Sequence, residues 1–394
     1  MSDKAKIIYL DHAATTPLDP AVIEAMLPYL KDEYVNPSSI YSAARSTRLA
    51  VESARATIAD ILGSKTTEII FTSGGTESDN LAVQGVLRAH PGSHWITSAI
   101  EHDAILSCVK PMKADGHEAT IVPVTAKGIV DIEPLKAAIT DETVLVSLML
   151  ANNEIGTIQP IVDVSKIVVR VRIDRLERGI TLPLYLHTDA CQAAGSLDLH
   201  VSRTHVDLMT LNGSKIYGPK GIGLLYVRHG VILEPLLYGG GQERGRRSGT
   251  ENVGGIVGLA AALDRAISVR DEESHRLTKL RDRLLDELSE LIPDLIVNGD
   301  RKRRLPNNVN ITIPKANGEA LVLYLDKAGI MASTGSACSS GDLEPSHVLL
   351  ALGRSTTEAD QSLRITLGRS TDKQAIERVI SELPTIVKRV RELG

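Results

Sequence analysis

One stretch of sequence decides the fold, and it reads Leu208-Met-Thr-Leu-Asn-Gly-Ser-Lys215-Ile-Tyr-Gly-Pro-Lys-Gly-Ile-Gly-Leu-Leu-Tyr-Val227. It combines an apolar strand, a polar break with one lysine, a Gly/Pro turn and a second strand. Lys215 is therefore expected at a strand end, between stiff elements and close to backbone that glycine leaves uncrowded. A lysine in this position can lose enough solvent to act as a neutral amine and form a Schiff base. The alternative is a solvated turn lysine, since most lysines are exposed.

The composition of the 394 residues is that of a soluble globular protein, with 43% apolar and 24% charged residues. The length favours about two domains. The formal net charge of −5 gives no electrostatic reason to expect nucleic acid or an anionic membrane as a partner. The basic run Arg301-Lys-Arg-Arg304 precedes a Leu-Pro-Asn-Asn turn and is interpreted as a solvated loop.

Targeting signals and cysteine spacing point to one cellular setting. The first apolar run is too short for a signal peptide, and no segment approaches the apolar length that spans a bilayer. Cys108, Cys191 and Cys338 are far apart and form neither a disulfide framework nor a Cys-x-x-Cys metal site. We therefore expect a reducing, cytoplasmic location.

Strand and helix patterns alternate through the middle of the chain. The expected strands cover residues 68–72, 95–100, 144–150 and 184–188, and the expected helices cover 77–90, the stretch after the second strand as far as 109, and 164–178. This alternation predicts an α/β fold with a mostly parallel sheet. Ligands of such sheets bind at the carboxyl ends of the strands, so the residues after each strand are the candidates for a site.

A possible phosphate site follows the first strand, in Thr72-Ser-Gly-Gly-Thr-Glu77. Gly74 and Gly75 let the backbone approach an anion closely. The first N–H groups of the helix and the hydroxyl of Thr76 could then hold a phosphate. The same residues also make an ordinary helix cap, so both interpretations stay open.

Polar side chains follow the next two strands. His102 can stack on a flat ligand or move protons, or it can be a helix-start histidine that faces water. Asn152 and Asn153 can donate hydrogen bonds to a ring oxygen or a carboxylate, although asparagine is also common in turns.

The strand at 184–188 leads into Asp189, whose carboxylate we expect to be partly buried and to need a cationic partner. A protonated ring nitrogen would provide that partner. A rival interpretation places His187, Asp189 and Cys191 on one face as metal ligands. The other strand ends offer no further ligand set of that kind, so we expect no metal.

Together these strand ends supply a lysine for a carbonyl, an aspartate for a ring nitrogen, a phosphate site, a histidine that can stack and amide donors. Pyridoxal 5′-phosphate is the cofactor that needs all five. Two later segments narrow the chemistry. The small residues at 332–341 suggest a mobile loop that presents Cys338 as a thiolate. Arg364, in the strand-like stretch 361–367, suggests a carboxylate clamp or a salt bridge.

Seven motifs, spread over nearly the whole chain, also carry a resemblance to a known family. They are Tyr9-Leu-Asp-His-Ala-Ala-Thr-Thr-Pro17, Asn36-Pro-Ser-Ser39, Thr72-Ser-Gly-Gly-Thr-Glu-Ser-Asp-Asn80, Asn152-Asn-Glu-Ile-Gly156, Lys215-Ile-Tyr-Gly-Pro-Lys-Gly221, Gly239-Gly-Gly-Gln-Glu-Arg-Gly-Arg-Arg-Ser-Gly-Thr250 and Gly335-Ser-Ala-Cys338. With these motifs the chain closely resembles the cysteine desulfurases, pyridoxal-phosphate enzymes of the fold-type I (class V aminotransferase) group. The cysteine loop is long, like that of the family branch with an extended mobile loop.

The resemblance implies a fold-type I transferase. Its large domain, residues 16–258, would carry a mostly parallel, seven-stranded sheet flanked by helices. A smaller α+β domain, residues 1–15 and 259–394, would carry the loop with the catalytic cysteine. The helix-rich stretch from residue 253 to residue 291 would link the two domains.

The resemblance also assigns roles to residues. It implies pyridoxal 5′-phosphate bound to Lys215, with Asp189 at the pyridine nitrogen, Gln192 at the ring oxygen and His102 stacked on the ring as a proton carrier. The implied phosphate ligands are Gly75, Thr76, Asn212, Ser214 and, from the second subunit of a homodimer, Thr250. Asn153 would contact the cofactor and, with Arg364, the carboxylate of the substrate.

The implied activity is the removal of sulfur from L-cysteine. The reaction would run through a ketimine and a persulfide on Cys338, leave L-alanine, and pass the sulfur to an acceptor protein of an iron–sulfur cluster or thiolation pathway. Other possibilities are a selenocysteine lyase, another pyridoxal-phosphate lyase or aminotransferase, and an inactive scaffold member of the family.

Three features depart from the family pattern. Ser214 stands where a histidine usually precedes the lysine, and Asn212 where a serine is common, so the hydrogen bonds to phosphate must be rearranged. The stretch 164–186 is longer than in close relatives, and we expect an extended helix and loop. The chain ends at Gly394, without the tail by which some relatives dock an iron–sulfur scaffold, which bears on the choice of acceptor.

Overall fold

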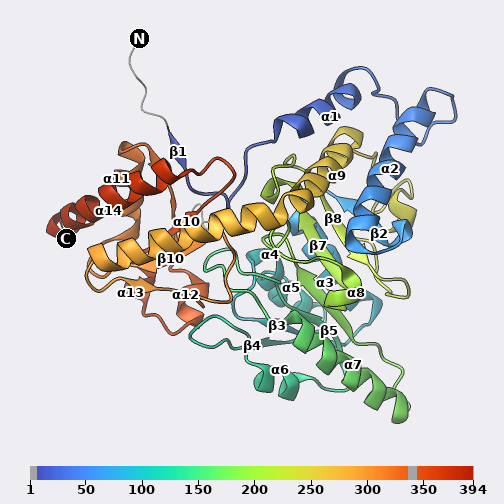
Figure 1. Cartoon of the computed structure of the whole chain (residues 1–394). Coiled ribbons are helices and arrows are strands. Elements are labelled where there is room, and N and C mark those ends of the chain that lie inside the picture. Colours follow the sequence, from blue (N-terminus) through green and yellow to red (C-terminus); the bar gives the residue numbers. More distant parts are fainter. Residues whose placement is uncertain (1–6, 336–343, 394) are drawn as a thin grey trace.

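A seven-stranded sheet forms the centre of the larger part of the chain in the computed structural model, which describes residues 7–335 and 344–393 (Figure 1). The strand order is β2-β8-β7-β6-β5-β3-β4, and only β8 runs antiparallel to its neighbours. The strands are β2 (Ile69–Thr72), β3 (His94–Ser98), β4 (Glu118–Val122), β5 (Thr143–Ser147), β6 (Tyr185–Asp189), β7 (Leu208–Asn212) and β8 (Gly223–Val227). The predicted α/β class with a mostly parallel sheet is confirmed.

Helices connect these strands and cover the sheet (Figure 1). They are α1 (Pro20–Lys31), α2 (Ala44–Leu62), α3 (Gly75–Ala89), α4 (Asp103–Leu106), α5 (Val109–Ala114), α6 (Ile132–Ala138), α7 (Ile161–Glu177), α8 (Val201–Thr204) and α9 (Val253–Ser268). Short 3-10 turns occupy Thr66–Glu68, Gly213–Lys215 and Glu243–Gly245. In the stretch singled out as longer than in relatives, α7 is followed by an irregular segment as far as β6.

Two predicted elements differ from the structure. The helix expected after β3 is broken into α4 and α5, because Pro111 has no N–H with which to continue a regular helical ladder. The strand expected to reach Leu150 ends at Ser147. Beyond Ser147 the chain still runs beside β6. Two isolated backbone hydrogen bonds hold it there, from the N–H of Leu148 to the carbonyl oxygen of His187 and from the N–H of Leu150 to that of Asp189.

A second, smaller unit gathers both ends of the described chain. β12-β13-β10-β9 form an antiparallel sheet, and the N-terminal β1 pairs with β11. The elements are β1 (Ile8–Tyr9), α10 (Arg270–Leu291), β9 (Ile296–Val297), β10 (Asn308–Thr312), α11 (Gly318–Lys327), β11 (Ile330–Met331), β12 (Ser333–Thr334), α12 (His347–Ala351), α13 (Thr356–Asp360), β13 (Ser362–Thr366) and α14 (Lys373–Leu393). The domain boundary at residues 258 and 259 stays a prediction. α9 spans it, and buried residues of α9 as far as Ala266 belong to the larger apolar core.

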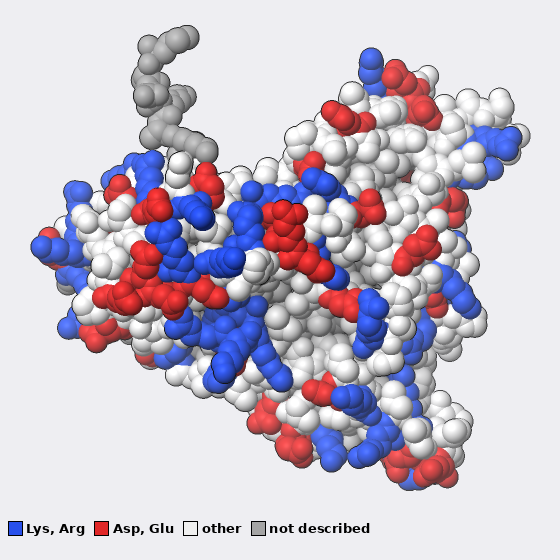
Figure 2. Space-filling view, viewed as in Figure 1, with Lys and Arg blue, Asp and Glu red and all other residues white. Residues whose placement is uncertain are grey.

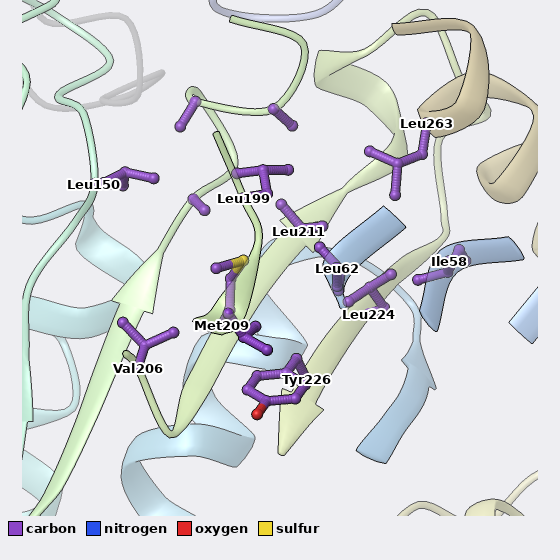
Figure 3. Packing of buried hydrophobic residues seen from close by; sticks show 14 of the residues in the cluster. Ile58, Leu62, Leu150, Leu199, Val206, Met209, Leu211, Leu224, Tyr226 and Leu263 are labelled. Carbon is purple, nitrogen blue, oxygen red and sulfur yellow. The ribbon is translucent and has the colours of Figure 1, made fainter. Parts of the chain in front are cut away.

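The strands that flank the lysine turn are fixed by one apolar core. Met209 and Leu211 of β7 and Leu224 and Tyr226 of β8 point to one face of the sheet, because alternate residues of a strand share a face (Figure 3). They pack against side chains of α2 and α9, namely Ile58, Leu62 and Leu263. The turn that carries Lys215 is therefore held from both sides by buried strands.

Charges of both signs are interspersed over the face of the molecule in Figure 2. Along α10, neighbouring turns pair Arg276 with Glu273 and Arg283 with Glu287. Within residues 7–335 and 344–393, no helix combines the length and apolar character needed to cross a bilayer.

We predict that Leu224→Ala lowers the free energy of unfolding by about 2–5 kcal/mol, because it leaves a cavity in the core beneath the lysine turn. The matched control is Leu323→Ala, whose side chain is 64% exposed on α11. Urea denaturation of the two variants measures the difference. Equal losses in both would contradict the role given to this core.

Candidate active site

A cavity of about 230 Å³ lies at the carboxyl ends of β6 and β7 and the N-terminus of α3. Most of the predicted site residues border it, although they come from distant parts of the sequence. Those that border it are Gly75, Thr76, His102, Asn153, Asp189, Gln192, Asn212, Lys215 and Arg364. The placement of ligand residues after parallel strands therefore agrees with the rule for α/β sheets.

Lys215 ends the 3-10 turn that directly follows β7. Its Nζ donates hydrogen bonds to the carbonyl oxygens of Ala13, at 2.9 Å, and Ala14, at 2.6 Å. Gly213 is needed in this turn because a Cβ there would lie 2.7 Å from the carbonyl oxygen of Pro219. The amine is thus held at the cavity wall by backbone contacts that the sequence did not predict.

Asp189 is the last residue of β6 and is 9% exposed. Its Oδ1 accepts a hydrogen bond of 2.9 Å from the backbone N–H of Cys191. Gln192 follows and donates from Nε2 to the carbonyl oxygen of Ala13 at 2.9 Å, so the segments around Asp189 and Lys215 meet at one point.

The N-terminus of α3 faces the cavity through Gly75 and Thr76. Among the described residues, no side chain caps this helix start, because the N-cap is Gly74. Gly75 is packed tightly, since a Cβ there would lie 3.0 Å from Sγ of Cys191. The first N–H groups of an α-helix have no partner within the helix, so this end can bind an anion.

His102 caps the start of α4, and its Nδ1 accepts a 3.0 Å hydrogen bond from the N–H of Ala104. The accepting nitrogen cannot carry a proton, so the proton of the neutral ring lies on Nε2. Asn212 Oδ1 accepts from both the N–H and the hydroxyl of Ser214, at 3.1 and 3.2 Å. The serine in the usual histidine position is therefore tied to the asparagine that borders the cavity.

Arg364 is 1% exposed on β13. Its Nη2 lies 2.8 Å from Oδ1 of Asp11, and its Nη1 lies 3.3 Å from the carbonyl oxygen of Asn153. Its Nε has no hydrogen-bond partner in the described part of the chain. Arg364 thus forms a salt bridge with Asp11 and borders the cavity, and the carboxylate clamp stays a prediction.

The two neighbouring asparagines have different surroundings. Asn152 is fully buried, where its side chain donates to the carbonyl oxygen of Ile100 and accepts from the N–H groups of Glu154 and Ile155. It therefore shapes the turn. Asn153 borders the cavity.

Three predicted site residues are not among those bordering the cavity. Ser214 lies behind Asn212, and Thr250 is exposed on the loop before α9. Cys338 lies outside the described residues. The chain on either side of it is fixed at the site, since Ser333 pairs with Arg364 and His347 Nε2 lies 2.9 Å from the carbonyl oxygen of Glu101.

Acidic groups gather around the cavity. Burial raises the pKa of Glu101 to about 8, and burial followed by the charge of Asp189 raises the pKa of Asp79 well above its usual value. Burial lowers the pKa of His187 to about 4, and this ring bonds with the hydroxyls of Ser147 and Thr210 at 2.8 and 3.1 Å. His187 is thus engaged with hydroxyls, and the described residues contain no group of three or more His, Cys, Asp or Glu that could hold a metal ion.

Besides Ala13 and Ala14, two titratable residues that border the cavity were not assigned to the pyridoxal-phosphate site by the sequence analysis, namely Asp79 and Cys191. Asp79 follows Thr76 at helical spacing, a pattern that could have placed it on the same face of α3. Cys191 was considered as one of three possible metal ligands, and it is buried, with burial the main cause of its raised pKa. Its thiol nevertheless borders the cavity.

Comparisons with known proteins agree with this architecture. The Aminotransferase class-V family matches residues 8–379. The cysteine desulfurase IscS of Dictyoglomus turgidum is 46% identical over 389 residues, which are 98% of this chain and 96% of that protein. A solved NIFS-like protein has a TM-score of 0.89 at 34% identity and covers 97% of this chain and 100% of its own. The solved structure of SspA in complex with cysteine has a TM-score of 0.78 at 35% identity, with coverage of 91% and 98%.

We predict that Glu101→Gln changes the pH dependence of stability. Folding raises the pKa of Glu101 from 4.5 to about 8, so the folded state keeps a proton that the unfolded state releases in this interval. As the pH rises through this interval, the free energy of unfolding of the wild type should therefore fall by about 1.4 kcal/mol per pH unit relative to that of the variant.

Thermal unfolding between pH 5 and 8 measures this effect, with the exposed Glu133→Gln as the control for loss of one carboxyl. Parallel curves for wild type and Glu101→Gln would contradict the buried, protonated state.

Proposed function

This chain belongs to the aminotransferase class-V family and, within it, to the cysteine desulfurases, and from that premise we propose that it takes the sulfur atom of L-cysteine and leaves L-alanine. The observation that carries the proposal is that Lys215, Asp189 and Arg364, which are distant in sequence, border one cavity. These side chains offer an amine, a carboxylate and a guanidinium, which suit a cofactor aldehyde, a ring nitrogen and a substrate carboxylate.

The cofactor of the proposal is pyridoxal 5′-phosphate. Asp189 would hold the ring nitrogen, and Gln192 and His102 would contact the ring. The phosphate would bind to the uncapped start of α3 at Gly75 and Thr76, with Asn212, Ser214 and Thr250 of the partner subunit. Two observations support the fit: no side chain caps α3 in the described chain, and the buried Asp189 borders the same cavity, where a positive ring nitrogen would compensate its charge. When bound, the cofactor supplies an aldehyde for amines and a ring that accepts electrons from the α-carbon.

Lys215 and His102 would handle protons. Lys215 would hold the aldehyde of the cofactor, and its amine would also receive the proton of the substrate's α-carbon. His102 is oriented by the bond from Ala104 N–H, which leaves Nε2–H as its donor toward other groups. A ring fixed in one tautomer can stack and donate without reorganisation.

Arg364 and Asn153 would bind the carboxylate of L-cysteine. Arg364 is buried, and Asp11 pairs with its guanidinium at 2.8 Å. Because Arg364 borders the cavity, its guanidinium can also bind the carboxylate of a ligand there. This arrangement would orient the amino group of the substrate toward Lys215 and its thiol toward the loop that contains residue 338.

Cys338 would accept the sulfur. Its thiolate attacks the sulfur of the bound L-cysteine, an S–S bond forms, and the C–S bond breaks. The electron pair of that bond stays with the carbon fragment, which takes up protons and leaves as L-alanine. Support comes from the flanking residues, since Ser333 pairs with Arg364 and His347 lies against Glu101, so the loop begins and ends beside the cavity.

The persulfide would then pass its outer sulfur to an acceptor protein of an iron–sulfur cluster or thiolation pathway. This chemistry needs reduced thiols. The described cysteines, Cys108 and Cys191, are free, which supports a reducing, cytoplasmic location.

A homodimer would complete the site. Ile23, Leu27 and Leu30 form an exposed apolar stripe on α1, about half exposed, at the spacing of one helix face. Further exposed apolar side chains lie in the following segment, on α2 and before the Thr250 loop, namely Tyr34, Ile40, Tyr41, Leu49, Leu237 and Tyr238. Apolar surface of this extent favours burial against a second copy, which would bring Thr250 of the partner subunit to the phosphate.

Cys338→Ala should bind the yellow cofactor and still lose release of sulfide from L-cysteine, because the sulfur has no acceptor. Mass spectrometry of the wild type after exposure to L-cysteine should find one extra sulfur on the peptide that contains Cys338. The control is Cys108→Ala, a buried thiol outside the cavity, which should keep the activity. Sulfide release by Cys338→Ala at the wild-type rate would rule out the persulfide route.

Leu27→Asp combined with Leu30→Asp should convert the dimer to a monomer and weaken cofactor binding by about tenfold or more, because the ligand from the second subunit is lost. Leu323→Asp, at a similarly exposed leucine on α11, is the matched control. Sedimentation and cofactor titration measure both effects. A double variant that stays dimeric would refute this interface.

A further inference from the structure

Asp79 is a buried carboxyl at the cavity that the proposed reaction does not use. It lies on α3, three residues after Thr76, so both side chains fall on one face of the helix. Asp79 is 1% exposed, and its Oδ1 has no hydrogen-bond partner among the described residues. A buried oxygen without a partner lowers stability, which is expected where a group serves a site.

Buried polar side chains continue behind Asp79. Nε2 of His187 lies 3.7 Å from Oδ1 of Asp79 and 3.1 Å from the hydroxyl of Thr210. The other ring nitrogen bonds with the hydroxyl of Ser147 at 2.8 Å. Because burial lowers the pKa of His187 to about 4, the ring is neutral and gives Asp79 no positive charge.

The groups around Asp79 do not compensate a negative charge on Asp79 in addition to the charge of Asp189. The titratable groups on the elements packed around it are Asp189 and His187 of β6, Glu101 after β3, Cys108 between α4 and α5, Cys191 after β6, and His102 and Lys215, which border the same cavity. Burial is the largest cause of the raised pKa of Asp79, and the charge of Asp189 is the second. Asp79 and Asp189 border one cavity, and two buried carboxyls that interact in this way cannot both ionise at low cost.

We propose that Asp79 is a positioning residue that keeps a proton beside Asp189, so that the two carboxyls together carry a single negative charge. The charge then resides on Asp189, the carboxylate that would face the ring nitrogen. Protonated Asp79 keeps an O–H that can donate to a group in the cavity. Only the identity of the ring rests on the proposed function, since the proton on Asp79 is a property of the protein alone.

Infrared spectroscopy of the full chain, with and without pyridoxal 5′-phosphate, tests for this proton. A protonated carboxyl has a C=O stretching band that is separate from the bands of carboxylates and shifts in D2O. At neutral pH the wild type should show the band, and Asp79→Asn should lose part of its intensity. Asp115→Asn, at an exposed position, is the matched control and should keep it.

Either of two results would overturn the proposal: a wild type without a protonated-carboxyl band at neutral pH, or an Asp79→Asn variant with the full wild-type band. If Asp79→Asn does not fold, the spectrum of Glu101→Gln decides, because this variant lacks the other carboxyl that holds a proton at neutral pH. Its remaining band should persist at neutral pH and fall as the pH is raised, and its absence at neutral pH would overturn the proposal.

The visible absorbance of the loaded protein gives a second readout. When Asp79 of the wild type ionises at high pH, a second negative charge appears near the ring, and the absorbance titration should contain a step that Asp79→Asn lacks. The same step in both proteins would contradict the role of Asp79. If the wild type binds no pyridoxal 5′-phosphate, the proposed function fails. The infrared measurement still tests whether Asp79 is protonated.

Discussion

The buried carboxylate of Asp189 is the constraint on which the rest of the site depends. Asp189 is the last residue of β6. The acidic residues Asp79 and Glu101 lie near it, and so does the neutral His187 of the same strand. Among the described residues that border the cavity, the Lys and Arg residues are Lys215 and Arg364. Arg364 is already paired with Asp11. Low-dielectric surroundings make an uncompensated carboxylate costly, so a ligand with a positive ring nitrogen fits the cavity.

The sheet delivers these groups to one place. β6 ends in Asp189, β7 leads into the turn with Lys215, and α3 begins after β2 with an uncapped N-terminus. The buried side chains of Leu211 and Leu224 hold the strands on either side of the lysine. Positions fixed in this way lose little entropy when a ligand binds.

The sequence predicted what short-range patterns can reveal. Apolar runs identified β2 and β6, and the rule that ligands gather after parallel strands selected Asp189 and Lys215 before any contact was known. The predicted end of β5 was wrong because it depends on pairing with β6. The predicted continuous helix after β3 was wrong because Pro111 lacks an N–H. The carbonyl groups of Ala13 and Ala14 that hold Lys215 were missed, since backbone oxygens have no sequence signature. Asp79 was missed for a similar reason, because its role depends on neighbours brought by β6 and β7.

The central claim is that the amine of Lys215 and the carboxylate of Asp189 serve one ring, and chemical trapping tests it most directly. The protein is loaded with pyridoxal 5′-phosphate, reduced with borohydride, digested and mapped by mass spectrometry. The account predicts a pyridoxyl phosphate group on the peptide that contains Lys215, and loss of this label in Lys215→Ala. A label on another lysine, or a wild type that takes up none, would contradict it.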